Sequence, residues 1–203
     1  VEFRPIVEEG VLAWNKSFKK AGFINAVQVK TQPDDATWDA GDIRYNVLRW
    51  TSSPNPPFGG YGPSFVNPRT GEILGADIML EYVYFTNRVK YDFLYKPELF
   101  DVDVNNCNAG EFIHQGNLFG MAALGAVDDF SQLEQHRLIY ESLVSLTLHE
   151  VGHTLGLNHN FYASHLHSFK NIHDRIITEP IGLTSSVMDY VPANVNDKPK
   201  HHG

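Results

Sequence analysis

The stretch SQLEQHRLIYESLVSLTLHEVGHTLGLNH, residues 131–159, predicts the central element of the fold. It starts with Ser131 and Glu134 in the spacing of a capping box, in which each side chain binds a free backbone N–H at the beginning of a helix. No proline interrupts the segment, and residues 143–148 (LVSLTL) are apolar on most sides, which is typical of a buried helix. Gly156 provides a stop, because glycine commonly lies just past a helix C-terminus. We therefore expect a long helix through the centre of the domain.

The C-terminal half of this predicted helix carries His149, Glu150 and His153 in the pattern H-E-x-x-H. Helical residues four apart lie one turn above each other, so both imidazoles project to one side and can share a metal ion. Glu150 lies one position round the helix, where its carboxylate can take a proton from a water molecule at the metal. The pattern therefore predicts two metal ligands and a general base.

A third ligand is predicted at His159, which extends the pattern to H-E-x-x-H-x-x-G-x-x-H. A helix that continued this far would carry the side chain away from the metal, whereas a left-handed glycine at position 156 turns the chain back. Three protein ligands and one open position are typical of catalytic zinc, whereas structural zinc sites favour cysteine, and no cysteine lies nearby in the sequence. We therefore favour one catalytic zinc ion over a structural site or a pair of hydrogen-bonded core histidines.

The composition excludes several other classes of protein. The chain has 203 residues, of which 42% are hydrophobic and 20% charged, as in ordinary globular domains. Its net charge is −8 and its 16 Lys and Arg residues are scattered, so no basic surface for nucleic acid is predicted. No apolar stretch approaches the ~20 residues that a membrane-spanning helix needs.

Cys107 is the only cysteine, which excludes an internal disulfide. It lies in DVDVNNCNAG, residues 101–110, a polar stretch typical of a turn. Nothing in this stretch would lower the pKa of a thiol, so we assign Cys107 no catalytic role.

The other elements follow from hydrophobic periodicity and turn residues. One face of a predicted N-terminal helix, which ends before Gly22, is formed by Val7, Val11, Trp14 and Phe18. Strands are predicted at residues 24–29, 43–50 and 73–85, a long loop at residues 51–72, and mixed helix and loop at residues 86–128. The resulting fold class is α+β, with a twisted mixed sheet and two long helices above a cleft.

The segment SSVMDY, residues 185–190, places Met188 twenty-nine residues after His159. With the zinc pattern, it resembles the metzincins, in which a tight turn, the Met-turn, puts a methionine beneath the metal. Three further segments look similar to the bacterial met-zincin domain of large multi-domain metalloproteases: PIVEEGVLAWN (residues 5–15), IRYN (residues 43–46) and GEILGADI (residues 71–78).

The resemblance implies a single catalytic domain over residues 1–203. Its N-terminal lobe, residues 1–159, would hold the sheet and the active-site helix, and a small irregular C-terminal lobe, residues 160–203, would hold the Met-turn. Metzincins generally end with a helix after this turn, and the polar tail at residues 196–203 does not predict one. We therefore expect the domain to continue further. The resemblance implies a longer parent chain, and we expect that chain to be secreted, periplasmic or at the cell surface.

The resemblance also implies two roles in substrate binding. The strand at residues 73–84 would be the sheet edge to which an extended peptide adds. Tyr190 would be an additional zinc ligand that swings away to hydrogen-bond the developing oxyanion of the substrate. Three further histidines, His165, His167 and His173, could form a second metal site, but solvated loop histidines are favoured.

The sequence thus predicts a zinc-dependent metalloendopeptidase that acts on a peptide or protein. Zinc would polarise the scissile carbonyl, and Glu150 would take the proton of the attacking water and return it to the leaving amine. The alternatives are a catalytically silent, zinc-containing peptide-binding domain and a zinc hydrolase of a non-peptide bond. Glu150 argues against the first, since a binding module needs no general base, and the long predicted edge strand argues against the second.

Overall fold

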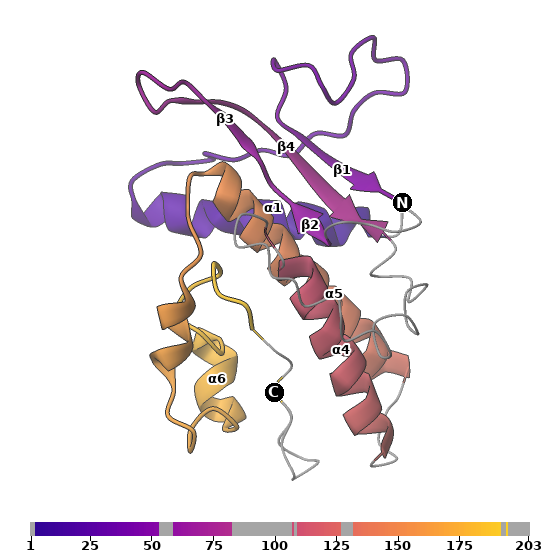
Figure 1. Ribbon diagram of the computed structural model, residues 1–203, viewed down its shortest axis with the longest axis vertical. Coiled ribbons are helices and arrows are strands. Elements are labelled where there is room, and N and C mark those ends of the chain that lie inside the picture. Colours follow the sequence, from indigo (N-terminus) through magenta and orange to yellow (C-terminus); the bar gives the residue numbers. More distant parts are fainter. Residues whose placement is uncertain are drawn as a thin grey trace.

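The computed structural model describes residues 3–52, 59–82, 107, 109–126, 132–191 and 194. These residues form a mixed α+β structure in which helices lie beneath a four-stranded mixed sheet (Figure 1). The helices are α1 (Arg4–Lys20), α4 (Ala109–Ala126), α5 (Gln132–Thr154), the 3-10 helix η2 (Phe161–Leu166) and α6 (Arg175–Ile181). The strands are β1 (Val47–Thr51), β2 (Gly60–Tyr61), β3 (Ser64–Val66) and β4 (Ile73–Glu81).

Helix α1 matches the predicted N-terminal helix. It begins with a proline in its first turn, and Gly22 ends it with φ +94°, a left-handed conformation that glycine adopts without strain. The Phe23 N–H donates to Phe18 O at 2.9 Å and the Gly22 N–H donates to Lys19 O at 3.1 Å, which together satisfy the last carbonyls of the helix.

Strand β4 lies in the middle of the sheet and is not its edge. It pairs with β1 in parallel on one side and with β2 and β3 in antiparallel fashion on the other. The predicted substrate edge at residues 73–84 is therefore wrong. A strand with apolar residues on both faces is typical of a covered, central position, and the Pro- and Gly-rich stretch predicted as one loop contains the short strands β2 and β3 that flank it.

Two other strand predictions need correction. Residues 24–29 form no strand, because the side chain of Asn15 takes both hydrogen bonds of Val27, donating to its carbonyl at 2.8 Å and accepting from its N–H at 3.0 Å. The strand predicted at residues 43–50 begins only at Val47. Before it, Asn46 Oδ1 accepts from the Ala76 N–H at 3.1 Å, so a side chain replaces the backbone pairing.

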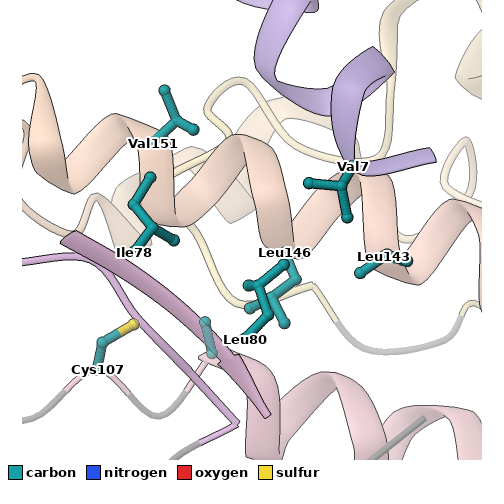
Figure 2. Close-up of a cluster of buried hydrophobic side chains, with 8 residues drawn as sticks. Val7, Ile78, Leu80, Cys107, Leu143, Leu146 and Val151 are labelled. Carbon is teal, nitrogen blue, oxygen red and sulfur yellow. The ribbon is translucent and has the colours of Figure 1, made fainter. Parts of the chain in front are cut away.

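The core lies between the sheet, α1 and α5, where Val7, Ile78, Leu80, Leu143 and Leu146 converge (Figure 2). The two helices approach closely because α1 has glycine at the crossing. A Cβ added at Gly10 would lie 2.7 Å from Thr147 Cβ. The Trp14 indole N–H donates to Leu148 O at 3.1 Å beside this crossing. Helix α5 is thus mostly buried over its C-terminal part, residues 142–154.

Helix α5 ends where the sequence predicts, one residue before Leu155, and α4 falls within the region predicted as mixed helix and loop. Ser131 of the predicted capping box and the tail at residues 196–203 lie outside the described residues, as do residues 83–106. In the described part of the chain, no helix is both long enough and apolar enough to cross a membrane.

Candidate metal centre

The end of α5 is built by Gly156, which has φ +87°. Its N–H donates to His153 O at 2.9 Å, and the Leu157 N–H donates to Gly152 O at 3.0 Å. This pair of bonds closes the helix as a Schellman motif and reverses the chain immediately afterwards. The predicted turn is confirmed, and it brings His159 back beside His153.

His149 is 2% exposed, and a hydrogen bond to the backbone of Val187 fixes the orientation of its ring. Its Nδ1 lies 2.8 Å from Val187 O, so Nδ1 carries the proton and donates, which leaves the lone pair of Nε2 free. Nε2 is buried and has no hydrogen-bond partner. Burial is the largest cause that lowers the pKa of His149 to about 4; His153 and His159 also lower it, and the hydrogen bond to Val187 O raises it, so the ring is neutral at physiological pH.

His153 and His159 complete a triangle of imidazoles. Their Nε2 atoms lie 3.1 Å apart. The ring centroid of His149 lies 4.8 Å from that of His153 and 5.2 Å from that of His159. His153 Nδ1 lies 2.9 Å from Leu157 O, which fixes that ring as Val187 fixes the first. Burial is the largest cause that lowers the pKa of both half-buried rings. Three neutral rings therefore present nitrogen lone pairs to one point.

Glu150 is fully buried beside this triangle. Strand β2 and the residues that follow it pass so close that a Cβ added at Gly60 would lie 2.7 Å from Glu150 Oε1, and one added at Gly62 would collide with the Glu150 backbone. Burial raises the pKa of Glu150 to about 8, against smaller lowering contributions from the Cys107 thiol and the Gly62 backbone. Gly60 and Gly62 thus leave room for a buried carboxyl group whose pKa lies close to neutral.

The turn at residues 185–190 packs against the end of α5 and the site histidines. Met188 is 2% exposed and packs against Gly152, where an added Cβ would collide with its Sδ. The Tyr190 hydroxyl lies 3.1 Å from His159 Nε2. Met188 and Tyr190 thus lie against the helix and the ring that carry the predicted ligands.

Hydrogen bonds hold this turn to the segment that follows α5. The Asn160 N–H donates to Met188 O at 2.9 Å, and Ser164 Oγ donates to Asp189 Oδ2 at 2.6 Å. The Ser185 N–H donates to Ala163 O at 3.2 Å. Backbone groups and short polar side chains therefore hold the turn at residues 185–190 to residues 160–164.

Cys107 is the residue at the site that sequence reasoning missed. It is buried, its Sγ donates to Glu150 Oε1 at 3.4 Å, and it groups with the three histidines as a possible metal ligand. Burial, followed by the charge of Glu150, raises the pKa of the Cys107 thiol to about 12. Hydrogen bonds with the Ala109 backbone and Tyr190 lower this pKa, contrary to the prediction that nothing does, but the net shift is upward. The sequence gave no sign of the position of Cys107, because Cys107 and Glu150 are 43 residues apart.

The other three histidines are not brought together. His165 is exposed, His167 Nε2 lies 2.8 Å from Gly182 O, and His173 is half-buried. Within the described ranges, the group of Cys107 and the three site histidines is the only cluster of possible metal ligands.

The donor set fits a zinc ion. Zinc prefers imidazole nitrogen and thiolate sulfur, and it commonly takes four ligands. A buried ring nitrogen without a partner is costly, and a metal cation would supply the missing partner of His149 Nε2. The cluster of His149, His153, His159 and Cys107 could therefore hold a metal ion.

Comparison with known proteins supports this interpretation for the C-terminal part of the chain. A protein-family model described as Met-zincin matches residues 131–203, which include α5, the three histidines and the turn at Met188. No curated protein and no solved structure matches the chain. The resemblance to a metzincin-type zinc metallopeptidase is thus confirmed over residues 131–203, the part of the chain that matches the Met-zincin model.

Proposed function

We propose that this chain is the catalytic domain of a zinc-dependent metalloendopeptidase with a metzincin-like fold. One observation carries the proposal: three neutral imidazoles converge on one point, and a fully buried glutamate lies beside them. A carboxylate next to such a ligand set is the arrangement that hydrolysis by an activated water requires. The match of residues 131–203 to the Met-zincin family supports the same function.

His149, His153 and His159 would hold the zinc ion. When bound, zinc supplies Lewis acidity that polarises a peptide carbonyl and makes water more acidic. The carbonyls of Val187 and Leu157 keep the Nδ1 proton on two of these rings. Such partners behind the ligands fix the ring orientation and increase ligand basicity.

Glu150 would act as the general base and then as the general acid. Its carboxylate takes a proton from the attacking water and delivers it to the amine that leaves as the peptide bond breaks. Because the pKa of Glu150 is raised to about 8 by burial, the residue can both accept and release a proton near neutral pH.

Tyr190 and Met188 would support this reaction from the turn at residues 185–190. The Tyr190 hydroxyl, 3.1 Å from His159 Nε2, is close enough to the ligand set to donate to the oxygen on which negative charge develops. Met188 forms an apolar floor beneath the histidine helix. We identify this turn with the Met-turn of the metzincins.

The substrate would align along β2 and β3. Among the described strands, these two form the side of the sheet that faces Glu150, and Gly60 and Gly62 abut that residue. An extended peptide that adds to this edge would place its backbone beside the general base. A crystal structure with a peptidic inhibitor would test this alignment, and inhibitor contacts confined to β1 would contradict it.

The domain would belong to a longer protein that acts outside the cytoplasm or at the cell surface, as the resemblance implies. Two other functions use the same ligand set. A silent peptide-binding domain would retain zinc without hydrolysis, and a hydrolase of another bond class would turn over esters or amides but no peptides.

The test is zinc quantification together with cleavage of a peptide library read by mass spectrometry. We expect about one zinc per chain and endoproteolytic products that disappear with a chelator and return with added zinc. Stoichiometric zinc without any cleavage in the presence or absence of reductant would support the silent domain. Failure to bind zinc would overturn the proposal.

A further inference from the structure

Two of the three site histidines are held by backbone carbonyls at the nitrogen that points away from the other rings. His149 Nδ1 lies 2.8 Å from Val187 O, and His153 Nδ1 lies 2.9 Å from Leu157 O. Each carbonyl fixes the plane of its ring and leaves Nε2 for a metal ion. The two nitrogens of an imidazole act independently in this way, so both contacts can persist after a metal ion binds.

His159 is held differently. In the residues that the structure describes, its hydrogen-bonding contacts are both made by Nε2, which lies 3.1 Å from His153 Nε2 and 3.1 Å from the Tyr190 hydroxyl. This is the nitrogen that faces the other ligands. A metal ion there would take the lone pair that accepts the hydrogen bond of Tyr190. Neither contact can therefore fix the ring of His159 once it is a ligand.

Aromatic packing takes the place of the carbonyl at His159. The ring of Phe161 stacks on that of His159, with the centroids 5.4 Å apart and an angle of 21° between the planes. Tyr190 forms T-shaped contacts with the His159 ring at 4.9 Å and with the Phe161 ring at 5.1 Å. Favourable aromatic pairs have centroids about 4.5–7 Å apart. A stacked ring restricts rotation of the imidazole and leaves both of its nitrogens accessible.

The fold places Phe161 beside His159 without burying it. Phe161 begins the 3-10 helix η2, and the residue before it, Asn160, donates its N–H to Met188 O at 2.9 Å. Ala163 on the same helix is 1% exposed, whereas Phe161 is 55% exposed. Core packing therefore does not account for the position of the Phe161 ring. The ring contacts that Phe161 makes within the described ranges are those with His159 and Tyr190.

We propose that Phe161 is a positioning residue for the third metal ligand, because its ring holds the plane of the His159 imidazole as the carbonyls hold those of His149 and His153. This inference rests on the zinc site of the proposed function, and it does not require that the site hydrolyse peptides. Since the contact lies on the face of the imidazole, it opposes the rotation that would withdraw His159 from the metal. Loss of the Phe161 ring should therefore speed zinc release more than it slows zinc binding.

Zinc affinity and zinc release test this role in four proteins: the wild type, Phe161→Leu, Phe161→Tyr and Tyr162→Leu. Phe161→Leu keeps an apolar side chain but removes the ring, so zinc should bind ~10-fold more weakly and leave faster in competition with a chromophoric chelator. Phe161→Tyr keeps the ring and should restore the wild-type values. Tyr162 is the matched control, because it is 82% exposed on the same helix and packs on His165, outside the ligand cluster. Tyr162→Leu should behave as the wild type.

A double-mutant cycle shows whether Phe161 acts through His159. Phe161→Leu should weaken zinc binding in the wild type and should cause no further loss in His159→Ala, measured with a weaker chelator. Cobalt gives a spectroscopic readout, because the visible absorption of bound cobalt depends on the arrangement of its ligands. Phe161→Leu should change this spectrum, whereas Phe161→Tyr should not. Urea unfolding of the metal-free protein should be the same in the wild type and Phe161→Leu, which separates an effect on the ligand from a loss of stability.

The outcomes separate this inference from the proposed function. Unchanged zinc affinity and release in Phe161→Leu, an equal loss in His159→Ala, or an equal loss of metal-free stability would overturn the role of Phe161 and leave the proposed function standing. Bound zinc without cleavage in the wild type would overturn the proposed function and leave the role of Phe161 standing. A wild-type protein that binds no zinc would overturn both.

Discussion

The buried part of α5 and the segment after Gly156 position the same metal centre by different means. Leu143, Leu146 and Glu150 are fully buried, and α5 is packed between α1 and the sheet. The later segment leaves large side chains in solvent, with Tyr162 82% and Phe169 89% exposed. Its turn is held by hydrogen bonds such as Asn160 N–H to Met188 O. Apolar burial fixes one half of the site and polar contacts fix the other.

This difference predicts a division of roles. Burial of apolar surface contributes ~25 cal/mol per Å², whereas one hydrogen bond contributes only about 1 kcal/mol net. The helix should therefore keep its ligands in place without metal, while the segment after Gly156 should depend on the metal for much of its order. Five predictions test this comparison, from the largest expected effect to the smallest.

Glu150→Gln should abolish nearly all hydrolysis, because the amide keeps the shape of the side chain but cannot accept a proton. Loss of a general base typically costs ~10²–10⁴-fold or more in kcat. The variant should fold and retain zinc, as expected of a change within a rigid helix. Steady-state kinetics and metal analysis check this, and cleavage at the wild-type rate would exclude Glu150 as the base.

His159→Ala should weaken zinc binding by more than ~10²-fold. This is a larger loss than mutation of a group that hydrogen-bonds a metal ligand usually causes. In the wild type, zinc should increase hydrogen-exchange protection most in residues 157–191, and this gain should vanish in His159→Ala. His153→Ala, on the helix, is the matched control for loss of a ligand. If zinc protects α5 as strongly as the later segment, the proposed division is wrong.

The pH dependence of metal-free stability should reveal the burial of Glu150 in α5. Its folded-state pKa is raised from 4.5 to about 8, so the stability it contributes is present below about pH 4.5 and is lost as pH rises through 8. In chelator, Glu150→Gln should gain stability relative to the wild type between pH 5 and 8.5, by roughly 2–5 kcal/mol. Urea denaturation at each pH measures the difference, and a difference independent of pH would show that the carboxyl is hydrated.

Gly10→Ala should destabilise the helix crossing. The added Cβ would lie 2.7 Å from Thr147 Cβ and 3.2 Å from Val144 O, so the two helices must separate. We expect a loss of about 1–3 kcal/mol in the free energy of unfolding, larger than the gain in helix propensity. The exposed Glu8→Ala, on the same helix, should change it by no more than about 0.5 kcal/mol. Equal effects would mean that the crossing is loosely packed.

Tyr190→Phe should have the smallest effect. It keeps the ring and removes the hydroxyl that lies 3.1 Å from His159 Nε2. We expect kcat to fall by ~10-fold with little change in KM, zinc content or stability, because the hydroxyl acts in the transition state. An unchanged kcat would leave Tyr190 as a packing residue of the later segment.

The sequence was most informative where the structure depends on short spacings. The metal-ligand pattern, the turn at Gly156 and the end of α5 each depend on residues within one or two helical turns, so local rules are enough to predict them. The same rules identified the helix ended by Gly22, which closes with the same pair of backbone bonds.

Features that depend on distant contacts could not be predicted in this way. The partners of β4 are β1, β2 and β3, and the local sequence of β4 does not specify which strands flank it. The Asn15 side chain, twelve residues away, takes the backbone hydrogen bonds of Val27 that a strand would need. Cys107 reaches Glu150 over 43 residues and Tyr190 over 83, separations at which no spacing rule applies.

The carbonyl of Val187 behind His149 has a consequence for how the protein is made. His149 and Val187 are 38 residues apart, and the ring of His149 is fixed only when both are present. During synthesis from the N-terminus, the imidazoles of His149 and His153 leave the ribosome well before residues 187–190, which orient His149 and pack against the helix. Correct metal loading is therefore expected only after residues 187–190 have been synthesised and folded back, so the metal would be acquired late.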